Sequence, residues 1–220
     1  MNIIRKGLKN MLSTILTAVL AGMAISVGGA VYLSVENHIA GAFLFCMGLF
    51  TIFAFGLSLY TGKVCYIPNK KPKYLAEVAC TYLGNAIGTI GSGYLFRATK
   101  LIKVADVCEK IVSAKLADTV PSTIIMGFMC GMLMCIAVVG YKVVKDNVGK
   151  YFAMVLPIMV FILCGFEHSI ADMFYFSFAN MWSAKAVGYI VLIALGNLIG
   201  GGFIPLVIRV ATGKKLGIDE

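Results

Sequence analysis

Residues 84–88 read Gly-Asn-Ala-Ile-Gly, and residues 196–200 read Gly-Asn-Leu-Ile-Gly, 112 positions later. A weaker match at nearly the same spacing pairs Gly56 with Gly165. Because the two spacings nearly agree, they indicate an internal repeat that divides the chain into two related halves. Each copy lies inside a long apolar stretch, and the nature of these stretches decides the fold class.

The apolar stretches are long enough to cross a membrane. Of the 220 residues 60% are hydrophobic and only 13% are charged, whereas soluble domains carry about 25% charged residues. About 20 apolar residues cross the ~30 Å hydrocarbon core of a bilayer. We predict an all-α membrane protein with one transmembrane domain over residues 1–220 and six spans, at about 11–34, 39–66, 75–96, 121–141, 151–178 and 186–210.

Three spans fall in each half, so the halves must cross the membrane in opposite directions. Such inverted repeats place the substrate site near the midplane, on interrupted helices. The spans 39–66 and 151–178 are the longest, at 28 residues each, so each must tilt or break. We expect non-helical backbone near residues 49–61 and 162–170, lining a cavity or buried in protein. A tilted, continuous helix is the alternative.

Basic residues predict the orientation. Six spans put both termini on one side, where thirteen Lys and Arg fall, against six on the other side. The excess predicts that both termini are cytoplasmic, although the basic link 97–120 argues against it. The first apolar run is too long for a signal peptide. We therefore predict a multi-pass, lipid-embedded protein of a bacterial inner membrane, and the net charge of +9 is assigned to topology and not to nucleic-acid binding.

The seven cysteines form no Cys-x-x-Cys pair, and six lie in apolar segments. Buried free thiols are expected, without disulfides, a metal site or a cofactor.

The span 151–178 contains the most polar motif. Residues 165–172 read Gly-Phe-Glu-His-Ser-Ile-Ala-Asp. Ionisable groups in a membrane are costly unless they face a partner or a cavity. A lone buried histidine is commonly a structural hydrogen-bonding group, but Glu167, His168 and Asp172 together indicate a functional site. Asp172 follows His168 by four positions, so a helix would bring them to one face and the carboxylate would favour protonated His168.

The span 39–66 carries a corresponding segment. Residues 56–62 read Gly-Leu-Ser-Leu-Tyr-Thr-Gly. Thr61 offers a hydroxyl group, and the glycines permit non-helical backbone. A glycine-rich packing face between helices is the alternative.

These segments resemble the formate/nitrite transporter family. Residues 165–172 are similar to its Gly-Phe-Glu-His-Ser-Ile-Ala-Asn signature, and residues 59–62 to its Leu-Phe-Thr-Gly segment. Residues 154–157 and 196–202 also fit, and the resemblance extends in register over all six predicted spans.

The resemblance implies an aquaporin-like protomer and a homopentamer with one pore per protomer. His168 would be the central pore histidine, Thr61 the hydroxyl that faces it, Glu167 its orienting group and Lys115 the lysine that the family keeps before the fourth helix. Asp172 completes the candidate site. Further lining residues implied by the resemblance are Phe45, Leu49 and Phe161 at apolar constrictions, with Leu59 and Tyr60.

The chain departs from the family at four places. Asp172 stands where the family usually has Asn, Gly131 replaces an Asn, and Ser58 stands where many members carry an acidic residue. The segment before the first span is also short.

The expected function is passive or proton-linked passage of small monovalent weak-acid anions, of the formate or nitrite class. Basic vestibules concentrate anions, apolar collars exclude hydrated ions, and a histidine can supply a proton or a hydrogen bond. Hydrosulfide, acetate and bicarbonate remain alternative substrates. A membrane subunit of a vitamin importer is the alternative of another class. No enzyme is predicted, since His-Glu-x-x-His and Gly-x-Ser-x-Gly are absent from the sequence.

Overall fold

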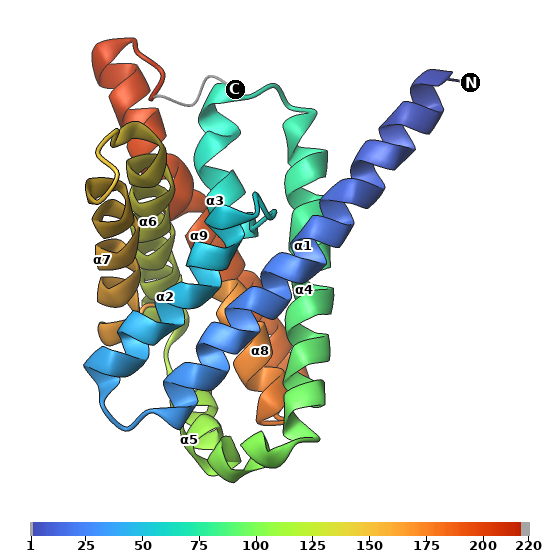
Figure 1. The fold of residues 1–220 in the computed structure, drawn as a ribbon, viewed down its shortest axis with the longest axis vertical. Coiled ribbons are helices and arrows are strands. Elements are labelled where there is room, and N and C mark those ends of the chain that lie inside the picture. Colours follow the sequence, from blue (N-terminus) through green and yellow to red (C-terminus); the bar gives the residue numbers. More distant parts are fainter. Residues whose placement is uncertain (1, 217–220) are drawn as a thin grey trace.

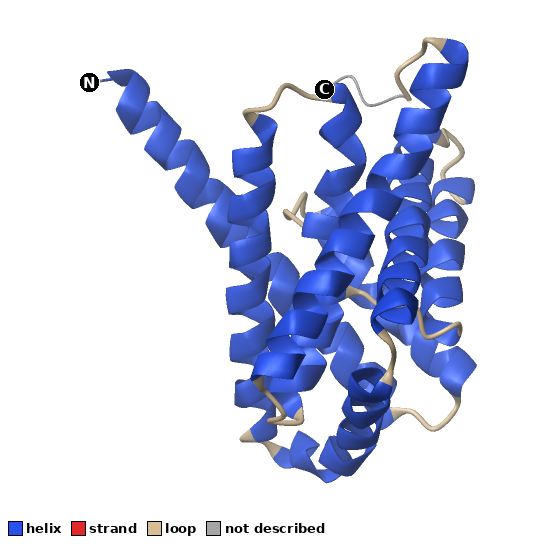
Figure 2. Ribbon diagram, turned by 180° about the vertical axis from the view of Figure 1, so that it is seen from behind, coloured by secondary structure: helices blue, strands red, loops and turns tan. Residues whose placement is uncertain are grey.

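The computed structural model describes the backbone of residues 2–216 and the side chains of residues 11–216, and this part of the chain is helical without a strand (Figure 2). The helices are α1 (Asn2–Ser34), α2 (His38–Ala54), α3 (Tyr60–Lys63), η1 (Val64–Asn69), α4 (Tyr74–Arg97), η2 (Lys100–Val104), α5 (Ala105–Ala117), α6 (Val120–Val143), α7 (Gly149–Leu163), α8 (Ser169–Phe178) and α9 (Ala184–Thr212).

The helices form a bundle whose two ends differ (Figure 1). Helix α5 closes one end, while α1 begins and α9 ends at the other. We call these the α5 end and the termini end. Helices α1, α6 and α9 contain segments that are long and apolar enough to cross a membrane, and α2 and α7 are shorter apolar helices. The protein is therefore a helical membrane protein by composition and helix length.

The halves of the chain pack in the same pattern. In the first half α1 packs against α2 and α4, and in the second α6 packs against α7 and α9. The short helices cross between the halves, because α8 packs on α4 and η1 packs on α9.

Both of the longest predicted spans are interrupted. The backbone is non-helical at residues 55–59, between α2 and α3, and again at 164–168, between α7 and α8. Gly56 has φ +62° and Gly165 has φ +67°, a region that glycine adopts without steric cost. The interruptions lie within the predicted stretches 49–61 and 162–170, but they are shorter than predicted, because residues 49–54, 60–61, 162–163 and 169–170 are helical.

The backbone of each interruption is hydrogen-bonded to an asparagine of the repeated motif. The Asn85 Oδ1 accepts a bond of 2.8 Å from the backbone N–H of Tyr60, and its Nδ2 donates to the carbonyls of Ala18 and Ser58. Asn197 repeats the pattern in the second half: Oδ1 accepts from Ser169 N–H at 3.0 Å, and Nδ2 donates to Gly127 and Glu167. Irregular backbone in an apolar interior needs such partners.

The glycines of the same motifs permit close helix packing. A Cβ at Gly88 would lie 2.2 Å from the Val19 carbonyl oxygen of α1, and one at Gly200 would lie 1.9 Å from the Phe128 oxygen of α6. At Gly84 and Gly196 the nearest atom would lie 2.6 Å from an added Cβ. All four glycines therefore lie at tight contacts between neighbouring helices of this chain.

Candidate functional site

His168 lies where the second interruption ends, immediately before α8. It is 2% exposed and is the N-cap of α8, with φ −109° and ψ 103°. Its Nδ1 accepts a bond of 3.1 Å from the Ala171 backbone N–H. An N–H can only donate, so Nδ1 carries a lone pair, and the proton of the neutral ring is on Nε2.

The Nε2 atom of His168 lies 2.9 Å from the Thr61 Oγ1. Because Nε2 carries the ring proton, Thr61 accepts this bond. Thr61 belongs to α3 and is fully buried, so this bond joins the two interrupted segments across the molecule. No further hydrogen bond of the Thr61 hydroxyl group occurs among the described residues, so its hydrogen remains to donate.

Two phenylalanines cover the histidine. The ring of Phe161 stacks on the His168 ring, with centroids 5.6 Å apart and planes inclined by 15°. Phe45 meets Phe161 edge-on, at 6.1 Å and 89°. The polar nitrogen atoms of His168 thus lie next to an apolar constriction.

A cavity of about 370 Å³ opens on the α5 side of His168, and we call it the small cavity. Phe45, Phe161 and His168 form part of its wall, together with Lys115, Glu167 and Asp172. Lys115 of α5 forms ion pairs with Glu167 and, at 3.0 Å, with the Asp172 Oδ1. These three groups form the Lys115–Glu167–Asp172 cluster.

The predicted pairing of Asp172 with His168 is wrong. Asp172 pairs with Lys115 instead, because His168 has extended backbone and α8 begins only at Ser169. Residues four positions apart share a face only when both are helical.

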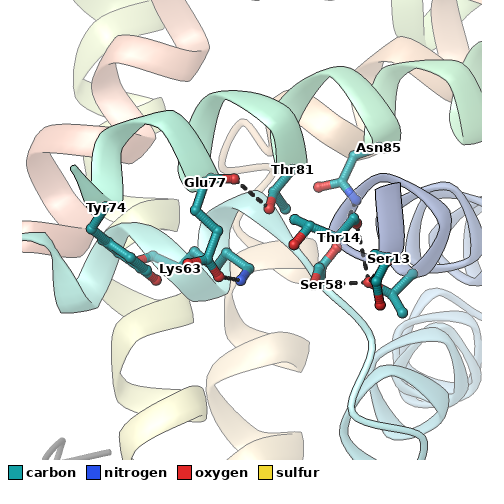
Figure 3. Close-up of polar contacts among 9 residues, drawn as sticks. Ser13, Thr14, Ser58, Lys63, Tyr74, Glu77, Thr81 and Asn85 are labelled. Carbon is teal, nitrogen blue, oxygen red and sulfur yellow. Dashed lines mark hydrogen bonds and ion pairs between the residues drawn. The ribbon is translucent and has the colours of Figure 1, made fainter. Parts of the chain in front are cut away.

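A larger cavity of about 1020 Å³, the large cavity, opens toward the termini end. Its wall includes six lysines and a single acidic residue, Glu77. The lysines are Lys63, Lys70, Lys71, Lys73, Lys142 and Lys215. Figure 3 shows Lys63 and Glu77 directed toward one another in an ion pair, with Ser58 and Asn85 nearby. Five lysines therefore remain to attract anions.

The two cavities share no wall residue, and the other predicted residues lie between or beside them. Leu59 lines the large cavity. Leu49 is fully buried and belongs to neither wall. Tyr60 is also outside both walls, with its hydroxyl bonded to the Ala194 carbonyl at 2.9 Å. Its role here is to fix α3 against α9 rather than to line a cavity.

Sequence reasoning did not assign a role to Asn85 and Asn197, although both stand in the repeated motif. The sequence contained a signal for this role: the same amide side chain stands in an apolar stretch of both repeats, and a buried amide needs hydrogen-bond partners such as backbone groups.

Comparison with known proteins adds independent evidence. Residues 2–211 match the model of the family described as formate/nitrite transporter. The chain belongs to the formate/nitrite transporter family.

Curated relatives of the family have similar sequences. The chain is 26% identical over 191 residues to "Formate channel FocB" of Escherichia coli (strain K12), covering 78% of this chain and 68% of the relative. It is 30% identical over 187 residues to "Formate channel BtFdhC" of Bacillus thuringiensis, covering 78% and 71%. The family resemblance is thereby confirmed, and these relatives are named as channels and not as enzymes.

Solved structures share the fold. A "Pentameric formate channel with formate bound" superposes with a TM-score of 0.76 at 21% identity, covering 94% of this chain and 99% of that one. An "FNT family ion channel" gives a TM-score of 0.81 at 19% identity, covering 96% and 94%.

Proposed function

We propose that the protein passes small monovalent weak-acid anions, of the formate or nitrite class, through a pore in each protomer. The observation that carries the proposal is the buried His168–Thr61 hydrogen bond, which lies between two cavities that share no wall residue. Hydrosulfide, acetate and bicarbonate have the same charge and similar size, and they are the alternative substrates.

The direction of that hydrogen bond supports an anion site. His168 donates to Thr61, and the Thr61 hydroxyl then donates to the anion. Neutral His168 and Thr61 only donate hydrogen bonds, so the proton that neutralises the anion comes from the solvent of the cavity by which it enters, and the neutral acid crosses apolar surroundings at a much lower cost than the ion. Passage is therefore linked to protons. The role of His168 is to donate the hydrogen bond that orients the Thr61 hydroxyl group toward the anion.

Apolar side chains supply selectivity. Phe45 and Phe161 border the small cavity, Leu59 borders the large one, and Leu49 is buried. A hydrated ion must lose water to pass such a collar. The lysines of the large cavity raise the local anion concentration on their side.

The arrangement in the membrane follows from the same features. We propose six spans, with α2–α3 and α7–α8 as interrupted spans and the halves as inverted repeats around the His168–Thr61 pair. The termini end is cytoplasmic, because most of the basic residues lie there. The pentameric formate channel of similar fold supports a homopentamer with the pore inside each protomer.

Uptake into liposomes tests the function. Purified protein is reconstituted without ATP, and entry of labelled formate or nitrite is followed down an imposed gradient. We expect uptake that unlabelled anions of the same class compete with and that needs no second protein. An importer subunit would instead bind its substrate without transporting it. If the protein increases the uptake of none of the five anions, the proposal is contradicted.

A further inference from the structure

We infer that the Lys115–Glu167–Asp172 cluster is a proton-binding site in its own right, separate from His168, which holds one proton between the Glu167 and Asp172 carboxyl groups. The site itself follows from the cluster alone. Its effect on transport rests on the proposed function.

The first observation is the charge balance of the cluster. One cation, Lys115, faces two carboxylates. The Glu167 residue is 7% exposed and Asp172 is 1% exposed. An uncompensated charge that is buried to this degree is strongly unfavourable. Binding of one proton removes it.

The second observation is that both acids bind the same ammonium group. The Lys115 Nζ pairs with the Glu167 Oε2 and with the Asp172 Oδ1, so the two carboxyl groups are held close together. Two ionised carboxylates are both acceptors and cannot bond to one another, whereas a protonated carboxyl group has an O–H to donate. Pairs of buried carboxyl groups in enzymes share a proton for the same reason.

The third observation is an oxygen atom without a donor. Asp172 uses Oδ1 for Lys115, while its Oδ2 is buried and has no hydrogen-bond partner among the described side chains. Buried polar atoms nearly always have a partner. A proton on the carboxyl pair supplies the missing one.

The other ionisable groups around Asp172 cannot compensate the charge of the second carboxylate. The ionisable groups that interact with its charge are Tyr82 of α4, Cys130 of α6 and, in α8 itself, Tyr175. His168 is engaged through both ring nitrogens. These groups add no positive charge, so Lys115 is the only cation that the described residues bring to the cluster.

The inference explains what the change from the family's Asn to Asp172 does. With Asn the cluster would hold one lysine and one carboxylate at every pH. With Asp172 it is neutral when the proton is bound and negative when the proton leaves. A negative charge on the wall of the small cavity repels an entering anion, so uptake from that side falls as the pH on that side rises.

Infrared difference spectroscopy tests the proton site without any transport. The pentamer is titrated from about pH 5 to about pH 8, and the carbonyl band of a protonated carboxyl group in a buried environment is followed. We expect the band in the wild type and its loss in Asp172→Asn. Asp118→Asn is the matched control, because Asp118 lines the same cavity while its carboxylate bonds to the Thr119 backbone N–H at the surface. This control is expected to keep the band.

A wild-type protein that lacks the band across this range overturns the inference, as does a band that persists in Asp172→Asn. Thermal unfolding of each variant shows whether it is folded. Uptake from the small-cavity side is then compared across pH: we expect the flux of the wild type to fall more steeply as the pH rises than the flux of Asp172→Asn. If the band behaves as expected while no variant transports anions, the proton site stands and the proposed function fails.

Discussion

Asn85 and Asn197 each stabilise the backbone of an interruption with three hydrogen bonds. Replacement of Asn197 by Ala removes all three and leaves the Ser169 N–H and the carbonyls of Gly127 and Glu167 without those partners. A buried backbone group without a partner costs about 1–3 kcal/mol.

We therefore expect Asn197→Ala to lower the thermal unfolding temperature of the purified protein markedly. Thr89→Val is the control, since the fully buried Thr89 hydroxyl bonds only to carbonyls of its own helix. Equal unfolding temperatures for the two variants would show that the interruption does not need the asparagine.

At this scale the sequence predicted the composition of the site better than its contacts. Glu167 and His168 were predicted as site residues because ionisable groups in an apolar stretch need a partner or a cavity. The position of Thr61 opposite His168 was implied only by the family resemblance, and the two side chains do form a hydrogen bond. The partner of Asp172 was not found, because its contact with Lys115 comes from another helix. Helical spacing failed at His168, where the backbone is extended.

At the scale of helices, the glycines of the repeated motif determine how closely α6 and α9 approach. A Cβ at Gly200 would lie 1.9 Å from the Phe128 carbonyl oxygen, and backbone cannot give way as a flexible side chain can. Gly188 lies in the same helix with nothing within 4 Å of an added Cβ.

We expect Gly200→Ala to destabilise the fold by about 1–3 kcal/mol, the usual cost of overpacking. Gly188→Ala should be neutral or stabilising by up to about 1 kcal/mol, because alanine has less freedom to lose on folding. Unfolding in mild detergent compares the two. A loss of stability in Gly188→Ala as large as that in Gly200→Ala would argue against close packing as the reason for the motif.

The interruptions were predictable as features but not as exact positions. The length of the two longest spans and their glycines indicated a break. Only the structure reveals that helix persists to Ala54 and Leu163, and that the breaks cover residues 55–59 and 164–168. These limits depend on where an amide from another helix can reach the backbone, which sequence spacing does not encode.

At the scale of the whole molecule, the cavities differ in charge. The large cavity has six lysines and one acid in its wall, whereas the small cavity contains the Lys115–Glu167–Asp172 cluster and Asp118. The basic residues could be counted from the sequence, but their gathering around one cavity depends on α3, the link before α4, the end of α6 and the segment after α9 lining the same space. Between the cavities lies the His168–Thr61 pair, on which the proposed function depends.

The most direct test of the central claim is uptake of labelled formate and nitrite by liposomes that contain His168 variants. His168→Phe removes the donor to Thr61 and the acceptor for the Ala171 N–H. His168→Asn retains an oxygen that can cap α8, so a loss of uptake in this variant reports on the missing imidazole and not on a misfolded helix. Thr61→Ser keeps the hydroxyl group and is the positive control. We predict that both His168 variants assemble like the wild type but lose uptake, and that Thr61→Ser transports. Wild-type uptake by an assembled His168→Asn protein would contradict the account.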